Sequence, residues 1–176
     1  MKTIVRNYGL TAGFLASAVL ILGSYFNRHS TDMVLGMVVG YTSFFICSAI
    51  IIYGMYKLKK QGYVRFKPLF IAGLLMSLIM SVMYTLSWLI FYHTVNYDPM
   101  AHYAAYMEQT WAGEGLSGDA LEAKRLEFTQ QMENYKKPHI MVLYTMLEIF
   151  PIAFLISALA ALVLMLRKPK SSPDLL

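Results

Sequence analysis

Cysteine and charge are both scarce in this chain of 176 residues. The one cysteine, Cys47, lies in an apolar run, so it forms no internal disulfide and no cysteine-based metal cluster. Charged residues make up 14% of the sequence and hydrophobic residues 57%, whereas soluble domains average about 25% and about 45–50%. A soluble domain of this length could not bury so much apolar surface, and a disordered chain needs low hydrophobicity. The composition therefore indicates a single-domain integral membrane protein.

Motifs of catalysis and cofactor binding are missing as well. The sequence holds no P-loop, dinucleotide-binding fingerprint, Gly-x-Ser-x-Gly elbow, Cys-x-x-Cys pair or His-Glu-x-x-His motif. Four histidines are present, but none are paired at i, i+4 spacing. A site built on His93, His139 and Asp98 is the less favoured alternative to ordinary interfacial polarity. We therefore predict a non-enzymatic protein with no cofactor and no bound metal.

Four apolar runs are each long enough to cross a bilayer, for which a helix needs about 20 residues. They cover about 8–26, 33–56, 68–95 and 139–166. Because isolated strands cannot span lipid and the runs show no polar–apolar alternation, we predict four transmembrane helices. We expect the first run to stay uncleaved, because its signal-peptide-like Ala-Ser-Ala pattern lies within the run rather than after it. A tight turn at 27–32 would join the first two helices, and the tail after Arg167 is expected to fray.

Positive charge is distributed unequally between the two sides of these runs. The two chain ends and the loop at 57–67 carry ten lysines and arginines against one acid, whereas 27–32 and 96–138 carry five against eight. The positive-inside rule then predicts a bacterial inner-membrane protein with both termini in the cytoplasm. Its basic face would meet anionic lipid headgroups, so the net charge of +5 implies no nucleic-acid partner. The expected partners are membrane lipids and another envelope membrane protein, and the oligomeric state is left open.

The long segment at 96–138 carries two helical patterns. Asp98-Pro99 is a favourable helix start, and apolar residues at helical spacing follow as far as Trp111. Three glycines interrupt the pattern, and Asp119 to Glu122 resembles a capping box that begins a second helix. We predict an extracytoplasmic helical hairpin between the third and fourth transmembrane helices. Its two apolar stripes are expected to pack on each other, and the alternative is a surface for a lipid or protein partner.

Glu148 is the one charged residue within the four apolar runs. An acid in hydrocarbon is costly and usually faces the bundle interior or a watery cavity. Tyr144 precedes it by one helical turn, and Pro151 follows, where the missing N–H lets the helix kink. The polar residues at similar depth in the other runs are all neutral: Ser17, Tyr41, Thr42, Ser81, Tyr84 and Thr85.

The lack of a cationic partner leads us to expect a neutral Glu148 carboxyl, hydrogen-bonded to a tyrosine or serine. The favoured interpretation of this intramembrane polar site is a clamp that holds the helices together. The alternative is a proton, cation or headgroup site.

Small residues recur every four positions in each run. The clearest examples are Gly9, Gly13 and Ser17, then Gly36 and Gly40, and then Gly73, Ser77 and Ser81. Close approach over small residues drives helix association in lipid, where no hydrophobic force acts between helices. We predict a compact all-α bundle of four transmembrane helices, with a dimer along one of these stripes as the alternative.

Several short motifs, taken in order, resemble a known family. They are Tyr8 to Gly13, Gly40-Tyr41, Tyr53 to Lys60, Asp98 to Met107, and Glu148 to Pro151 followed by Leu155 to Leu159. Over nearly its whole length the chain is similar to the domain-of-unknown-function family 4199 (DUF4199), small four-helix inner-membrane proteins typical of Bacteroidota. The resemblance implies a location and an architecture but no activity, and it makes Glu148 and Pro151 the expected signature positions.

Two functions remain after these observations. The favoured prediction is a non-enzymatic accessory or assembly partner in the cell envelope. The alternative is a small carrier or lipid-handling protein with an intramembrane carboxyl site at Glu148. A sealed and hydrogen-bonded carboxyl at this position would favour the first, and an open cavity would favour the second.

Overall fold

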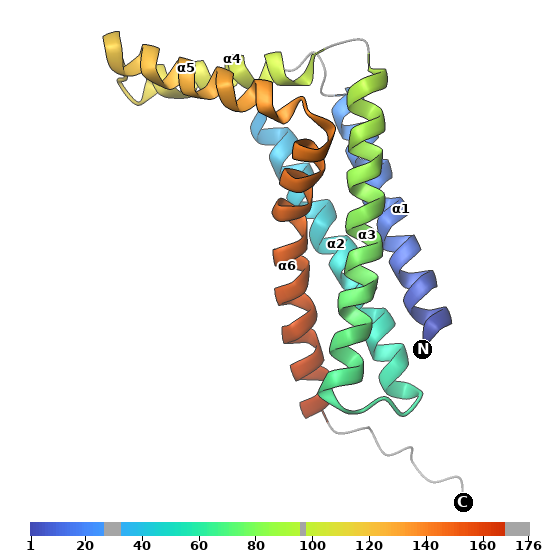
Figure 1. The fold of residues 1–176 in the computed structure, drawn as a ribbon. Helices are drawn as coiled ribbons and strands as arrows, with labels where there is room; N and C mark the ends of the chain where they lie inside the picture. Colours follow the sequence, from blue (N-terminus) through green and yellow to red (C-terminus); the bar gives the residue numbers. More distant parts are fainter. Residues whose placement is uncertain (27–32, 96–97, 168–176) are drawn as a thin grey trace, which may run out of the picture.

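Six helices and no strand form the part of the chain that the computed structural model describes, which is residues 1–26, 33–95 and 98–167. The helices are α1 (Lys2–Phe26), α2 (Met33–Lys60), α3 (Phe66–Thr94), α4 (Pro99–Gly113), α5 (Gly118–Tyr135) and α6 (Pro138–Leu166) (Figure 1). Four of them, α1, α2, α3 and α6, are long and apolar enough to cross a membrane. The all-α prediction with four such helices is confirmed. The turn predicted at 27–32 and the tail at 168–176 lie outside the described residues.

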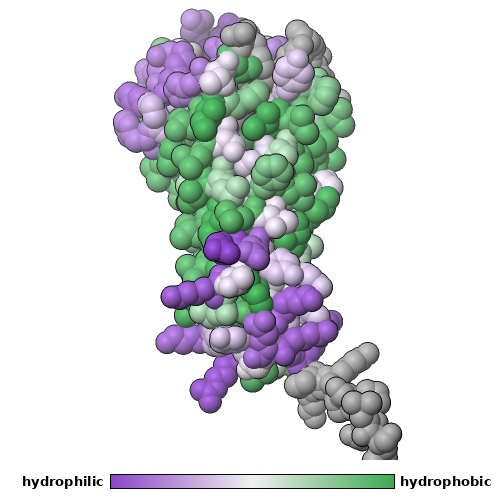
Figure 2. Space-filling view, turned by 90° about the vertical axis from the view of Figure 1, so that its right-hand side faces the viewer, coloured by the Kyte–Doolittle hydropathy of each residue, from purple (hydrophilic) through white to green (hydrophobic). Residues whose placement is uncertain are grey.

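The long helices extend beyond the apolar runs where the flanking residues are basic. Helix α1 begins at Lys2 rather than near Tyr8, and α2 continues to Lys60. Lysine and arginine can stay helical at such ends because their long side chains reach past the apolar region to polar surroundings. A broad hydrophobic band consequently separates two hydrophilic ends of the molecule (Figure 2).

Helix α3 lies at the centre of the bundle and packs on α1 and α6 over small residues. A Cβ atom at Gly9 would lie 3.0 Å from Ile79 Cδ1, and one at Gly13 would lie 3.1 Å from Met83 Cβ. From the first contact to the second, the residue number rises by four on both helices. The two helices α1 and α3 therefore run parallel. On the other side of α3, the Ser77 and Ser157 hydroxyl oxygens are 3.0 Å apart, in a buried hydrogen bond to α6.

The two halves of α2 differ in burial. Cys47, Met55 and Leu58 in the second half are fully buried, whereas residues 34–42 in the first half are all exposed. Figure 1 shows α2 inclined to the other long helices. The bundle is therefore packed at its basic end and opens toward the end where α4 and α5 lie.

A lysine links two helices at the packed end. Lys59 Nζ on α2 donates to the main-chain oxygens of Leu164 and Arg167. These carbonyls lie at the C-terminus of α6, where the helix dipole favours a cation and the last carbonyls have no partner within the helix.

Helices α4 and α5 pack along each other and extend sideways from the long helices (Figure 1). The ring of Trp111 lies edge-on to that of Phe128, 5.5 Å away, and Arg125 Nε lies 3.2 Å from Glu108 Oε1. Asp98 begins α4 as predicted, since its carboxylate accepts hydrogen bonds from the next helical N–H groups. The extracytoplasmic position of this α4–α5 pair stays a prediction.

The predicted capping box at Asp119 is wrong. Helix α5 begins two residues earlier than a capping box at Asp119 requires, at Gly118, and Ser117 occupies the N-cap position without a side-chain cap bond. Gly118 has a φ of +58°, a conformation that glycine adopts without steric cost, so the turn ends there. Asp119 lies in the first turn, where its negative charge stabilises the helix N-terminus.

Candidate functional site

A cavity of about 590 Å³ lies where the first half of α2 departs from the bundle. Residues of α1, α2, α3 and α6 form its walls, and α4 contributes Met100, His102 and Tyr103. Cavities of about 300–1,000 Å³ with mostly apolar walls and few polar groups are typical binding sites for small molecules. Leu20, Leu35 and Ile152 are among the apolar side chains of this one.

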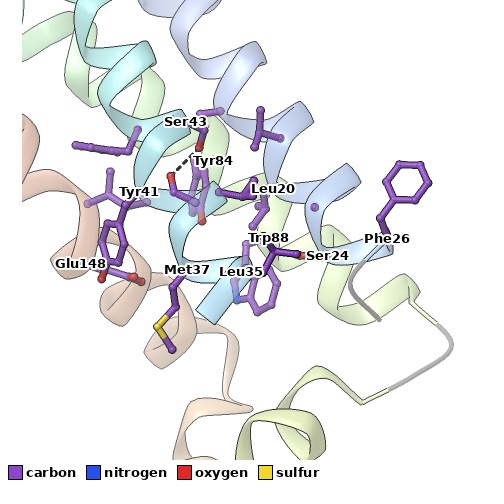
Figure 3. A pocket seen from close by; sticks show the side chains of 18 of the residues that line it. Leu20, Ser24, Phe26, Leu35, Met37, Tyr41, Ser43, Tyr84, Trp88 and Glu148 are labelled. Carbon is purple, nitrogen blue, oxygen red and sulfur yellow. Dashed lines mark hydrogen bonds between the residues drawn. The ribbon is translucent and has the colours of Figure 1, made fainter. Parts of the chain in front are cut away.

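Glu148 supplies the carboxylate of the cavity wall. Its side chain extends from α6 beside Tyr41 of α2, in the same opening as Tyr84 and Trp88 of α3 (Figure 3). The Glu148 side chain is exposed rather than sealed among packed neighbours. No lysine or arginine is among the described residues that line the cavity.

The Glu148 carboxyl differs in its bonding from the sequence-based expectation. Within the described part of the chain it forms neither a hydrogen bond nor an ion pair, although we expected a bond to tyrosine or serine. The carboxyl is thus positioned to meet an occupant of the cavity.

The structure brings only part of the predicted polar site together. Tyr84 lines the cavity with Glu148, whereas Ser17 and Ser81 have buried hydroxyls without a partner among the described residues. Tyr144 is exposed, and its ring lies 6.2 Å from that of Tyr135. Helix α6 continues through Pro151.

The predicted packing glycines also divide into two groups. Gly9, Gly13 and Gly73 lie in close helix contacts. Gly36 and Gly40 instead line the cavity, and a Cβ atom at Gly40 would meet no described atom within 4 Å. Of the predicted packing glycines, the two on α2 therefore lie at the cavity, whereas those on α1 and α3 lie between packed helices.

The sequence did not predict the hydrogen bond that Trp88 forms. Its indole Nε1 donates to Tyr135 Oη at 2.7 Å, which joins α3 to the end of α5. Burial raises the pKa of the Tyr135 hydroxyl, and the hydrogen bond with Trp88 acts in the opposite direction. No sequence pattern pairs residues that are 47 positions apart.

No group of three histidine, cysteine, aspartate or glutamate side chains that could hold a metal ion occurs among residues 1–26, 33–95 and 98–167. His93 bonds instead to the main-chain oxygen of Leu89, one turn earlier in its own helix. His29, in the segment 27–32, lies outside the described residues.

Comparison with known families identifies the family of the chain. A family model described as "Protein of unknown function (DUF4199)" matches residues 7–165. The chain belongs to the DUF4199 family. Neither a curated protein nor a solved structure matches it. All described residues that line the cavity, from Ala16 to Ile152, fall within the matched DUF4199 region.

Proposed function

We propose that this DUF4199 protein binds a lipid-like amphiphile in the cavity between α1, α2, α3 and α6, and that it acts as a small carrier or lipid-handling protein. The observation that carries the proposal is the Glu148 carboxyl, exposed without a described partner on the wall of a mostly apolar cavity. Apolar walls suit acyl chains, and in a bilayer the chain would be held by van der Waals packing against these walls, because no hydrophobic force acts there. An acid at membrane depth is costly, so its presence there indicates a functional contact.

Filling the cavity tests this proposal. Gly40→Leu adds a side chain where no described atom lies within 4 Å, so it is expected to occupy the cavity without disturbing the helices. Native mass spectrometry of protein extracted in mild detergent should show lipid-like adducts on the wild type and few on Gly40→Leu. The matched control is Gly113→Leu, which adds the same side chain at an open position on α4 away from the cavity. Equal adducts on all three proteins would contradict the proposal.

An accessory or assembly role in the envelope is the second candidate function. The α4–α5 pair extends sideways beyond the long helices and has no buried residue in α5, so it offers a large polar surface to a partner (Figures 1 and 2). A pull-down in mild detergent should then recover a second membrane protein, and the recovery should be lost when residues 99–135 are replaced by a short linker.

We further place the protein in a bacterial inner membrane with its basic end in the cytoplasm. The start of α1 and the end of α6 lie at the same end of the bundle, together with Lys57, Lys60 and Arg65 (Figure 1). This arrangement agrees with the positive-inside rule.

Cysteine labelling is expected to report this orientation. Ser117 and Gln61 are exposed at opposite ends of the bundle, and the native Cys47 is fully buried, so it contributes little background. A membrane-impermeant maleimide should label Ser117→Cys on intact spheroplasts and Gln61→Cys only after lysis. The reverse pattern would show that the basic end faces outward.

A further inference from the structure

The charge inside the cavity is unbalanced. Among the described lining residues, Glu148 is the carboxylate, and the remainder are apolar, aromatic or neutral polar side chains apart from His102. A carboxylate beside hydrocarbon needs a counter-charge or hydrogen bonds to offset its lost hydration. Because the described part of the chain provides no lysine or arginine there, an occupant that carries one positive charge would complete the site.

Aromatic rings surround the same space. Tyr41 extends toward Glu148 from α2, and Tyr84 and Trp88 face the opening from α3 (Figure 3). The indole N–H of Trp88 is already bonded to Tyr135, so the ring itself forms the cavity wall. The π faces of tryptophan and tyrosine attract ammonium groups, and a nearby carboxylate adds to this attraction.

We infer that the occupant is an amphiphile with a single ammonium head group and no phosphate, bound with its nitrogen at Glu148 and its chain along the apolar walls. The inference rests on the proposed function and specifies its ligand. A phosphate would require a cation, and no lysine or arginine lines the cavity among the described residues. The acyl chain would lie toward Leu20, Leu35 and Ile152.

The native tryptophans allow a direct test. The chain has two tryptophans, Trp88 in the cavity wall and Trp111 in the α4–α5 pair, so Trp111→Phe leaves Trp88 as the single reporter. The variant is reconstituted in vesicles of phosphatidylcholine with brominated acyl chains, which quench the Trp88 fluorescence. Amphiphiles with one common chain, namely oleylamine, oleyl alcohol and oleate, are then added, and the recovery of fluorescence measures displacement of brominated chains. Phosphatidylethanolamine with unbrominated oleoyl chains serves as a fourth, phosphate-bearing probe.

Oleylamine is expected to restore Trp88 fluorescence at a concentration about tenfold lower than oleyl alcohol, with oleate the weakest. Glu148→Gln should abolish the difference between amine and alcohol, and Glu148→Lys should make oleate the preferred probe. Glu148→Asp keeps the negative charge and should keep the preference for the amine. If Glu148→Gln fails to fold, the Glu148→Asp and Glu148→Lys variants still test the role of the charge. Glu122→Gln, which removes an acid from α5 outside the cavity, is the matched control and should behave as the parent.

The outcomes distinguish an error in the assigned ligand class from an error in the proposed binding site. If all probes restore fluorescence equally and Gly40→Leu prevents the recovery, the cavity binds amphiphiles but the ammonium assignment is overturned. Recovery with phosphatidylethanolamine as strong as with oleylamine overturns the exclusion of phosphate. If no probe restores fluorescence, or if Gly40→Leu leaves the recovery unchanged, the proposed function itself fails.

Discussion

Gly73→Leu is expected to disrupt the packing of α3 on α6 and to lower the stability of the bundle strongly. A Cβ atom at Gly73 would lie 2.8 Å from Met55 Sδ and 3.0 Å from Ser157 Cβ. The end of the Met55 side chain can turn away, but Ser157 Cβ is fixed to the α6 backbone, so the helix itself must move. Overpacking a well-packed core costs about 1–3 kcal/mol, and separation of the helices would also break the buried Ser77–Ser157 hydrogen bond.

Thermal unfolding in detergent, followed by size-exclusion chromatography, measures this loss. The midpoint for Gly73→Leu should fall well below that of the wild type. Gly23→Leu is the control within α1, because a Cβ atom at Gly23 has no described neighbour within 4 Å. If the two variants have the same midpoint, close packing at Gly73 does not determine stability.

Truncation of Trp111 is expected to unfold the α4–α5 pair while the four long helices remain folded. Trp111 is 7% exposed and is the buried residue of this pair among its described side chains. Replacing a buried tryptophan with alanine costs about 3–5 kcal/mol. Helices of 15 and 18 residues are marginal in water without tertiary contacts, so the pair has little else to retain its structure.

Hydrogen exchange followed by mass spectrometry distinguishes local from global unfolding. In Trp111→Ala, peptides from residues 99–135 should lose protection, whereas peptides from 138–166 should stay protected. Leu126→Ala removes an apolar side chain that is 62% exposed on α5, and it should leave protection unchanged. Retained protection in Trp111→Ala would mean that contacts such as Arg125–Glu108 suffice to hold the two helices.

The four long helices were predictable because a membrane span depends on length and composition, which are both local properties of the sequence. Their ends were harder to place, since Lys2 and Lys60 are polar and yet continue the helices. Asp98 marked the start of α4 because capping is a short-range interaction. The start of α5 was misplaced because it depends on the positive φ of Gly118, which the sequence does not distinguish from any other glycine conformation.

The candidate site was only partly predictable for a different reason. Glu148 was recognisable as the lone charge in the apolar runs, but the cavity beside it results from the departure of one half of α2. Both halves of α2 are apolar and contain glycine. A Cβ atom at Gly54 would lie 2.9 Å from Tyr8 Cγ, whereas one at Gly40 would meet no described atom within 4 Å. Only tertiary packing distinguishes the two, and a single sequence does not record it.

The close packing at the basic end of the bundle determines from which side a ligand would enter and leave the cavity. Met55 and Leu58 are fully buried toward the basic end, and Lys59 links α2 to the end of α6 there. In the proposed membrane orientation, the cavity would open toward the leaflet at the α4–α5 end. A ligand bound at Glu148 would then return to the leaflet from which it came, so the proposed function becomes sequestration or presentation of the ligand rather than its transfer across the bilayer.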